Sequence, residues 1–103
     1  MASATEKVVT VVNPMGIHMR PADQISRAAK RFQSKIEIEK DGQSIDCKSI
    51  INILTLGARQ GTQLNLRASG VDADEAVAVL AGLFARGFDD CESDSEVVIP
   101  EPS

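Results

Sequence analysis

Hydrophobic and polar residues alternate in four short stretches of the chain, as they do in half-buried β-strands. The second stretch, Lys-Ile-Glu-Ile-Glu-Lys, places its two isoleucines on one face and its glutamates on the other. Asp41 and Gly42 follow it directly, and this pair favours a two-residue hairpin turn because both positions tolerate positive φ angles. We therefore predict strands at residues 7–12, 35–40, 43–47 and 62–69, of which the second and third form an antiparallel hairpin.

Three further stretches have the spacing of amphipathic helices. In the first, residues 19–32, apolar side chains at positions 22, 25, 29 and 32 fall on one stripe. The second, residues 49–56, begins at Ser49, a residue type that is preferred as a helix N-cap. The third begins at Asp72, with Glu75 at the matching position of a capping box, and ends at Gly87, which suits the C′ position.

This βαββαβα order predicts an α/β fold of the α+β type. A sheet that is apolar on one face needs only one covering layer, and three helices on that face supply it. We expect an open-faced two-layer β-sandwich, in which a four-stranded antiparallel sheet is covered on one face by three helices.

Length and charge divide the chain into two parts. Its 103 residues are enough for one domain. Residues 1–88 hold 11 basic and 9 acidic residues, whereas residues 89–103 hold six acidic residues and no lysine or arginine. We therefore predict a slightly basic domain at residues 1–88 and a flexible acidic tail at residues 89–103.

Composition also excludes several classes of function. No apolar stretch approaches the roughly 20 residues that span a bilayer, and the N-terminus lacks a secretory signal, so we expect a cytoplasmic protein without membrane insertion. The chain has no Tyr or Trp for base stacking and a pI of about 4.9, which argues against nucleic-acid binding. Cys47 and Cys91 have no metal-site spacing, and we expect reduced thiols, no metal and no cofactor.

The chemistry is concentrated around His18, the only histidine, between the first strand and the first helix. Pro21 suits a first helical turn, which places the helix start close to the imidazole. The positive end of the helix and Arg20 would then stabilise an anion bound to the ring and favour its neutral, nucleophilic form. His18 is therefore a candidate phosphoryl acceptor, and a surface or capping histidine is the alternative.

The segment from Gly16 to Ala22, Gly-Ile-His-Met-Arg-Pro-Ala, resembles the phosphorylation-site signature of the HPr family, the histidine-containing phosphocarriers of the bacterial phosphoenolpyruvate:sugar phosphotransferase system. The resemblance covers about residues 6–88, and its further motifs are Lys48-Ser49-Ile50, Leu56-Gly57, Gly61 and Gly70. The chain departs from the family pattern at Met19, where a small residue is usual, and in its acidic extension.

The resemblance implies a role for each matching residue. His18 would be phosphorylated on Nδ1 by enzyme I and would pass the phosphoryl group to sugar-specific IIA domains, while Arg20 contacts that group. Ser49 matches the serine that HPr kinase/phosphorylase modifies. These roles describe a stoichiometric carrier rather than an independent enzyme, and we expect a monomer.

Apolar residues are distributed over more than one face of the second predicted helix, so some of them must face outward. The resemblance points to Ile50, Ile51 and Leu54 as partner-facing, and the alternative is that all belong to the core. Met19, which departs from the family pattern beside His18, would then also face partners and affect which of them bind.

Arg20, Arg27 and Arg31 fall on one side of the first helix and form a basic ridge that starts beside His18. Such a ridge would steer acidic partners, although a solvated polar face explains it equally well.

A second function also stays open at this point. In this alternative, the chain is a regulatory or nitrogen-type HPr paralogue of the phosphotransferase system, which acts mainly by binding partners rather than in sugar uptake.

Overall fold

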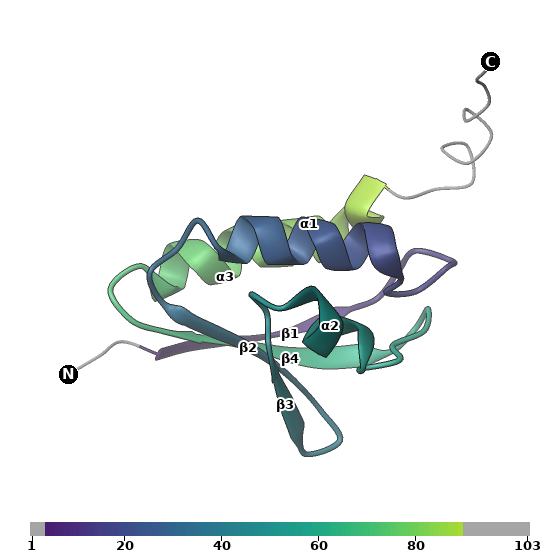
Figure 1. The fold of residues 1–103 in the computed structure, drawn as a ribbon, viewed down its shortest axis with the longest axis horizontal. Helices are drawn as coiled ribbons and strands as arrows, with labels where there is room; N and C mark the ends of the chain where they lie inside the picture. The colour runs from purple at the N-terminus through teal and green to yellow at the C-terminus, as the bar shows by residue number, and fades with distance from the viewer. Residues whose placement is uncertain (1–3, 90–103) are drawn as a thin grey trace.

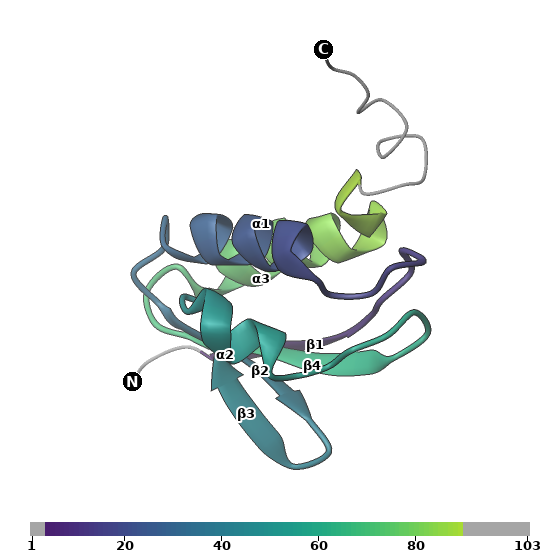
Figure 2. The same ribbon diagram turned by 45° about the vertical axis from the view of Figure 1, so that its right-hand side comes forward.

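A four-stranded antiparallel sheet and three helices form two layers in the computed structural model, which describes residues 4–89 (Figure 1). The elements in chain order are β1 (Ala4–Thr10), α1 (Met19–Ala29), β2 (Lys35–Lys40), β3 (Gln43–Asp46), α2 (Ile50–Leu54), β4 (Gln63–Ser69), α3 (Ala73–Ala85) and the short 3₁₀ helix η1 (Gly87–Asp89). All three helices lie on one side of the sheet, which confirms the predicted open-faced sandwich (Figure 2).

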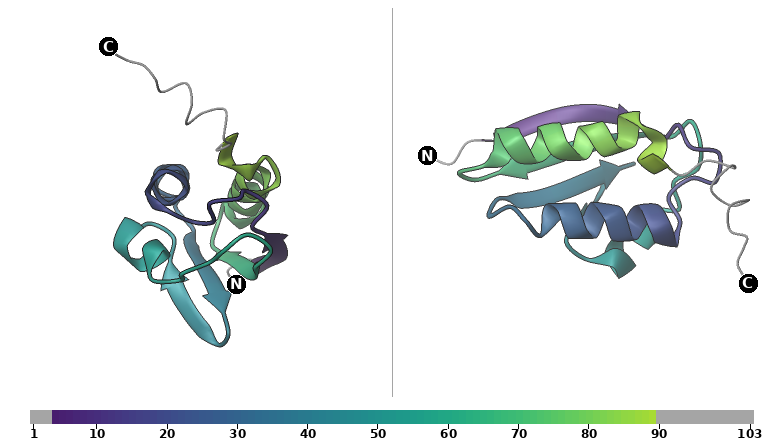
Figure 3. Two further views of the ribbon diagram at one scale, coloured as in Figure 1. Left: turned by 90° about the vertical axis from the view of Figure 1, so that its right-hand side faces the viewer. Right: turned by 90° about the horizontal axis from the view of Figure 1, so that it is seen from above.

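The strands are arranged in the order β1-β4-β2-β3, and every neighbouring pair is antiparallel. In the central pair Ile38 lies opposite Leu66, and both side chains are completely buried. Helices α1 and α3 lie side by side above this face (Figure 3), and they contribute Ile25 and Leu80 to the same core. The alternation of β2 and β4 therefore decides which face of the sheet the helices cover.

The predicted hairpin between β2 and β3 is confirmed. Asp41 and Gly42 have φ angles of 52° and 83°, and the flanking residues Lys40 and Gln43 pair directly. Two consecutive positive φ angles are the geometry of a tight hairpin turn with the twist of the flanking strands.

The predicted strand ends are shifted by one to three residues. β1 spans Ala4–Thr10 instead of residues 7–12, β3 ends one residue earlier than predicted, and β4 begins one residue later. The ladder between β1 and β4 ends at the Thr10–Gln63 pair. Beyond it, the amide of Val11 still donates to the carbonyl of Thr62 (2.9 Å), and the amide of Gly61 donates to the carbonyl of Val11 (2.7 Å). The side chain of Gln60 then donates to the carbonyl of Val12 (3.0 Å), so the last contacts on this side come from the loop before β4.

The apolar stripe of α1 is confirmed, because Ala22, Ile25 and Ala29 are fully buried and Phe32 is nearly so. The helix itself ends at Ala29 rather than at position 32. The amides of Arg31 and Phe32 bond to carbonyls three residues back instead of four, which tightens the chain and ends the helix. The same tightening ends α2 at Leu54, two residues before the predicted end.

The capping box predicted at the start of α3 is wrong. Asp72 makes no side-chain cap to this helix. Its carboxylate instead accepts hydrogen bonds from the amides of Gln33 and Ser34 (2.9 Å each) and from the Ser34 hydroxyl. These bonds, led by the hydroxyl of Ser34, lower the pKa of Asp72. Asp72 thus ties the loop after α1 to the start of α3.

The end of α3 agrees with the prediction, because Gly87 has a φ of 64° directly after the helix. Phe88 and Asp89 keep positive φ angles of 59° and 53° in η1. Phe88 is fully buried and packs edge-on against Phe84, with ring centroids 4.9 Å apart. The predicted acidic tail begins inside η1 at Asp89, and the rest of it lies outside the described residues.

Candidate functional site

The segment that leads into α1 is held against the loop between α2 and β4. Asn13 is buried, and its side-chain amide donates to the carbonyl of Gly16 (2.7 Å). The amide of Ile17 donates to the carbonyl of Ala58 (2.9 Å). These bonds fix the backbone on the approach to His18. Sequence reasoning missed Asn13, although an asparagine before Pro14 in a glycine-containing loop is a typical turn signal.

Gly16 has to be glycine for two reasons. Its φ of 71° is in the left-handed region that other residues rarely adopt. A Cβ atom at this position would also lie only 2.5 Å from the carbonyl oxygen of Ala58. The first residue of the signature therefore allows the close approach of two loops that positions the site.

His18 is the N-cap residue of α1. Its backbone is extended (φ −109°, ψ −161°), and its carbonyl accepts the first hydrogen bond of the helix, from the amide of Ala22 (2.9 Å). The imidazole makes no capping bond to the helix and is half-buried. The imidazole therefore does not cap the helix, and the alternative of a surface histidine stays open.

The residues that follow form the first turn as predicted. Met19 begins α1 and is 60% exposed, Arg20 is also exposed, and Pro21 is buried beneath them. The helix dipole places partial positive charge at this end, next to the ring of His18. An anion attached to the imidazole would meet this charge, and Arg20, two residues later, supplies a cation on the same turn, so the site suits a phosphoryl group.

Ser49 caps α2, which confirms its predicted structural role. Its hydroxyl accepts a hydrogen bond from the amide of Asn52 (3.3 Å), and its carbonyl accepts one from the amide of Ile53 (3.0 Å). Ser49 is half-buried. Its place at a helix N-terminus means that a phosphate on the hydroxyl would be tolerated electrostatically.

Side-chain bonds hold α2 beside α1. The hydroxyl of Ser26, which is buried on α1, donates to the carbonyl of Lys48 (3.2 Å), and the ammonium of Lys48 donates to the carbonyl of Phe32 (2.9 Å). The two candidate phosphorylation sites, His18 and Ser49, are therefore on neighbouring helices of one face. The sequence pattern showed no sign of the Ser26 contact, since this serine lies between two apolar stripe positions.

The apolar residues of α2 divide between core and surface. Ile53 is completely buried, Ile50 and Leu54 are half-buried at the edge of the core, and Ile51 is 70% exposed. The alternative that all of them belong to the core is therefore wrong. Together with Met19 on α1, Ile51 leaves substantial apolar surface on the two neighbouring helices.

The three arginines of the predicted ridge are all exposed. Arg27 forms an i,i+4 ion pair with Asp23, with an N–O distance of 2.9 Å. Arg31 lies in the turn after α1 instead of on the helix. A role of this ridge in steering partners stays a prediction.

Residues 4–89 show neither a metal site nor a membrane-spanning helix. No three His, Cys, Asp or Glu side chains in this part of the chain lie together in a way that could hold a metal ion. None of its helices is long and apolar enough to cross a membrane.

Burial raises the pKa of the Cys47 thiol above its ordinary value, and the nearby carboxylates of Asp46 and Glu37 add to the effect. Cys91 lies outside the described residues.

Comparison with known proteins agrees with this geometry. The family model of the phosphorylation site of the phosphotransferase system HPr component matches residues 5–86. The phosphocarrier protein HPr of Lysinibacillus sphaericus is 40% identical over 75 residues, which cover 73% of this chain and 85% of that protein.

Solved structures give the same result. The crystal structure of HPr-C-His from Thermoanaerobacter tengcongensis has a TM-score of 0.80 and 36% identity, covering 84% of this chain and 97% of that one. The phosphocarrier protein HPr of Bacillus anthracis has a TM-score of 0.76 and 35% identity, covering 80% and 98%. A further structure from Thermoanaerobacter tengcongensis, with a TM-score of 0.68, 36% identity, and coverage of 80% and 94%, is that of an HPr dimer. The chain belongs to the HPr family, the phosphocarriers of the phosphotransferase system.

Proposed function

We propose that this chain accepts a phosphoryl group on His18 from phospho-enzyme I and passes it to sugar-specific IIA domains. The observation that carries the proposal is the position of His18 at the N-cap of α1, where its side chain does not cap the helix. Family membership supports the carrier role in general. Arg20 follows two residues later on the exposed first turn and supplies a cation for the transferred group.

The transfer needs little from the carrier beyond positioning and charge. The lone pair of Nδ1 on the neutral imidazole attacks phosphorus, and the bond between phosphorus and the donor breaks, so its electron pair stays with the donor. The positive end of α1 and Arg20 stabilise the oxygens of the new phosphoryl group. In the second transfer the N–P bond breaks toward an acceptor group on the IIA domain, which restores the imidazole.

Labelling tests this assignment. Incubation with radiolabelled phosphoenolpyruvate and enzyme I should give an acid-labile, base-stable label on the wild-type chain and none on a His18→Ala variant. Arg20→Ala should slow the transfer and leave the far-UV circular dichroism spectrum unchanged, because it removes an exposed charge and little packing. Label retained by His18→Ala would overturn the assignment, and unchanged transfer by Arg20→Ala would remove this arginine from the site.

We also propose that partners dock on the surface of α1 and α2 beside His18. Met19 and Ile51 contribute exposed apolar area, and Ile50 and Leu54 border it. Arg27 and Arg31 would attract acidic partners, because exposed charge near a contact raises the rate of encounter. Replacement of Ile51 by serine should weaken enzyme I binding without loss of stability, since 70% of this side chain is exposed. Unchanged binding would exclude Ile51 from the contact.

Ser49 is proposed as a regulatory site for HPr kinase/phosphorylase. A phosphate adds about −1.5 to −2 charges at neutral pH. On α2, this charge would repel an acidic partner while the helix itself tolerates it. Incubation with the kinase and ATP should therefore phosphorylate the wild-type chain and not Ser49→Ala, and equal phosphorylation of both would exclude this serine.

The remaining part of the proposal concerns assembly and compartment. We expect a monomer that acts in the cytoplasm, where enzyme I and the kinase would be met. Light scattering of the purified chain should give the mass of one copy, whereas the mass of two copies would show that this chain resembles the dimeric Thermoanaerobacter structure.

A further inference from the structure

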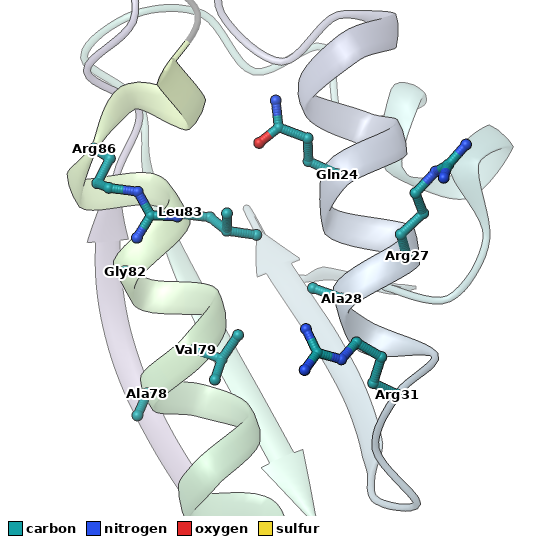
Figure 4. A pocket seen from close by; sticks show the side chains of 9 residues that line it. All are labelled: Gln24, Arg27, Ala28, Arg31, Ala78, Val79, Gly82, Leu83 and Arg86. Atoms are coloured by element: carbon teal, nitrogen blue, oxygen red, sulfur yellow. The ribbon is translucent and has the colours of Figure 1, made fainter.

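A groove of about 490 Å³ runs between α1 and α3 on the outer side of the helical layer (Figure 4). Its rim is basic, because Arg27 and Arg31 come from α1 and the turn after it, and Arg86 comes from the end of α3. Among residues 4–89, no carboxylate lines the groove. Its floor includes apolar side chains, among them Ala28 and Leu83. The groove therefore suits a ligand with several negative charges and some apolar surface.

Two of the three arginines point into the groove. Figure 4 shows Arg31 and Arg86 reaching toward the gap from the two sides, whereas Arg27 turns outward. Arg31 forms no ion pair within residues 4–89, and the Nε atom of Arg86 lies 3.7 Å from the Asp89 carboxylate in an exposed pair. Exposed pairs of this kind are weak. Both guanidinium groups can therefore bind carboxylates that enter the groove.

One of these cations lies beside a glycine of α3. Gly82 lies inside α3, where glycine is less favourable than alanine. A Cβ atom at this position would lie 3.4 Å from Nη1 of Arg86. The guanidinium of Arg86 therefore lies against α3 at this glycine, at the edge of the groove.

The last described residues, Phe88 and Asp89, lie at one end of this groove. Phe88 is fully buried, and its carbonyl accepts a hydrogen bond from the side chain of Gln24 (3.0 Å). Gln24 also lines the groove. Burial maintains the positive φ angle of Phe88. Asp89, the last described residue, pairs with Arg86 on the basic rim of the groove.

The segment that begins there has the matching charge. Residues 90–103 contain five carboxylates, Asp90, Glu92, Asp94, Glu96 and Glu101, and no lysine or arginine. Position 24 to position 31 spans only about 10 Å along a helix. A segment of this length can reach about 45 Å when extended, so a few of its residues are enough to follow the groove. A tether this short also gives an effective concentration of about millimolar.

We propose that the acidic segment 90–103 binds in the groove between α1 and α3 of the same chain, with its carboxylates against Arg31 and Arg86. Charge complementarity and the place where the described fold ends favour this occupant over a separate acidic partner. The proposal does not depend on phosphoryl transfer by His18, because neither His18 nor Arg20 lines the groove.

Backbone and arginine side-chain NMR spectra of full-length chains test the proposal. A neutral-tail variant replaces the five carboxylates of residues 90–103 by their amides. At low ionic strength, the wild type should differ from it in the amide signals of α1 and α3 and in the Nε signals of Arg31 and Arg86. The differences should fade as salt is added, because the Debye length is about 10 Å at 0.1 M. They should be unaffected by dilution, because the contact is within one chain.

Charge-matched variants locate the contact. Combined Arg31→Gln and Arg86→Gln substitutions should reduce the tail-dependent shifts about threefold or more. Lys35→Gln, which removes an exposed charge from the open face of the sheet, should leave them unchanged. Identical spectra of wild type and the neutral-tail variant would overturn the proposal, as would shifts confined to residues 13–20. Shifts that vanish on dilution would assign the groove to a second copy, and shifts caused only by added inorganic phosphate would assign it to free anions.

Discussion

Replacement of Gly16 by alanine tests how the site loop is positioned. The left-handed φ of 71° costs a residue with a Cβ atom about 1–2 kcal/mol. The new Cβ would also lie 2.5 Å from the Ala58 carbonyl, so the two loops must separate. Separation weakens the 2.9 Å bond from the Ile17 amide, which contributes about 0.5–1.5 kcal/mol. We expect Gly16→Ala to lower the free energy of unfolding by about 1.5–3.5 kcal/mol.

Gly57 provides a matched control in the facing loop. Its φ is 57°, but no heavy atom lies within 4 Å of a Cβ built there. Gly57→Ala should therefore cost only the backbone contribution of about 1–2 kcal/mol. Urea unfolding followed by far-UV circular dichroism measures both variants, since the chain has no Trp or Tyr for fluorescence. The proposed packing would be refuted if the two variants were equally stable, or if Gly16→Ala kept the wild-type rate of phosphorylation.

Three further predictions concern other positions. Asp72→Asn should lower the free energy of unfolding most at neutral pH. Because the pKa of Asp72 is lowered in the folded state, the difference in free energy between wild type and variant should shrink below about pH 4. Denaturation at several pH values measures it. A pH-independent difference would contradict the charged bonds to Gln33 and Ser34. Gly82→Ala should raise the free energy of unfolding by up to about 1 kcal/mol, and a loss would mean that Arg86 cannot shift. Ser49→Ala should lose about 0.5–2 kcal/mol of capping, whereas Ser49→Asp should keep its stability and lose enzyme I affinity; equal affinity of both would argue against a switch.

Local patterns predicted most of the fold because they act over a few residues. Asp41 and Gly42 determine a turn through their own φ angles, and the stripe through Ile25 is set by helical spacing. The same holds for the N-cap at Ser49, whose hydrogen-bond donor is three residues away. Predictions of this kind need no knowledge of the tertiary structure.

Predictions failed where residues distant in the chain compete for the same group. The capping box required the Asp72 carboxylate to face its own helix, but the amides of Gln33 and Ser34 bind it from 39 and 38 residues away. The hydrogen bond from Ser26 to Lys48 and the groove around Arg86 likewise depend on how helices pack, which periodicity does not encode. At the site, the signature indicated the reacting histidine. The hydrogen bond from the Ile17 amide to the Ala58 carbonyl, which positions the site loop, became visible only in the fold.

The position of the phosphoryl group is the most direct test of the central claim. The chain should be phosphorylated with phosphoenolpyruvate and enzyme I, with its imidazole enriched in ¹⁵N, and examined by phosphorus and nitrogen NMR. The account predicts one phosphoryl group per chain, with phosphorus coupled to Nδ1 of His18. A phosphorus signal coupled to no ring nitrogen, or a phosphoryl group that remains in His18→Ala, would contradict it.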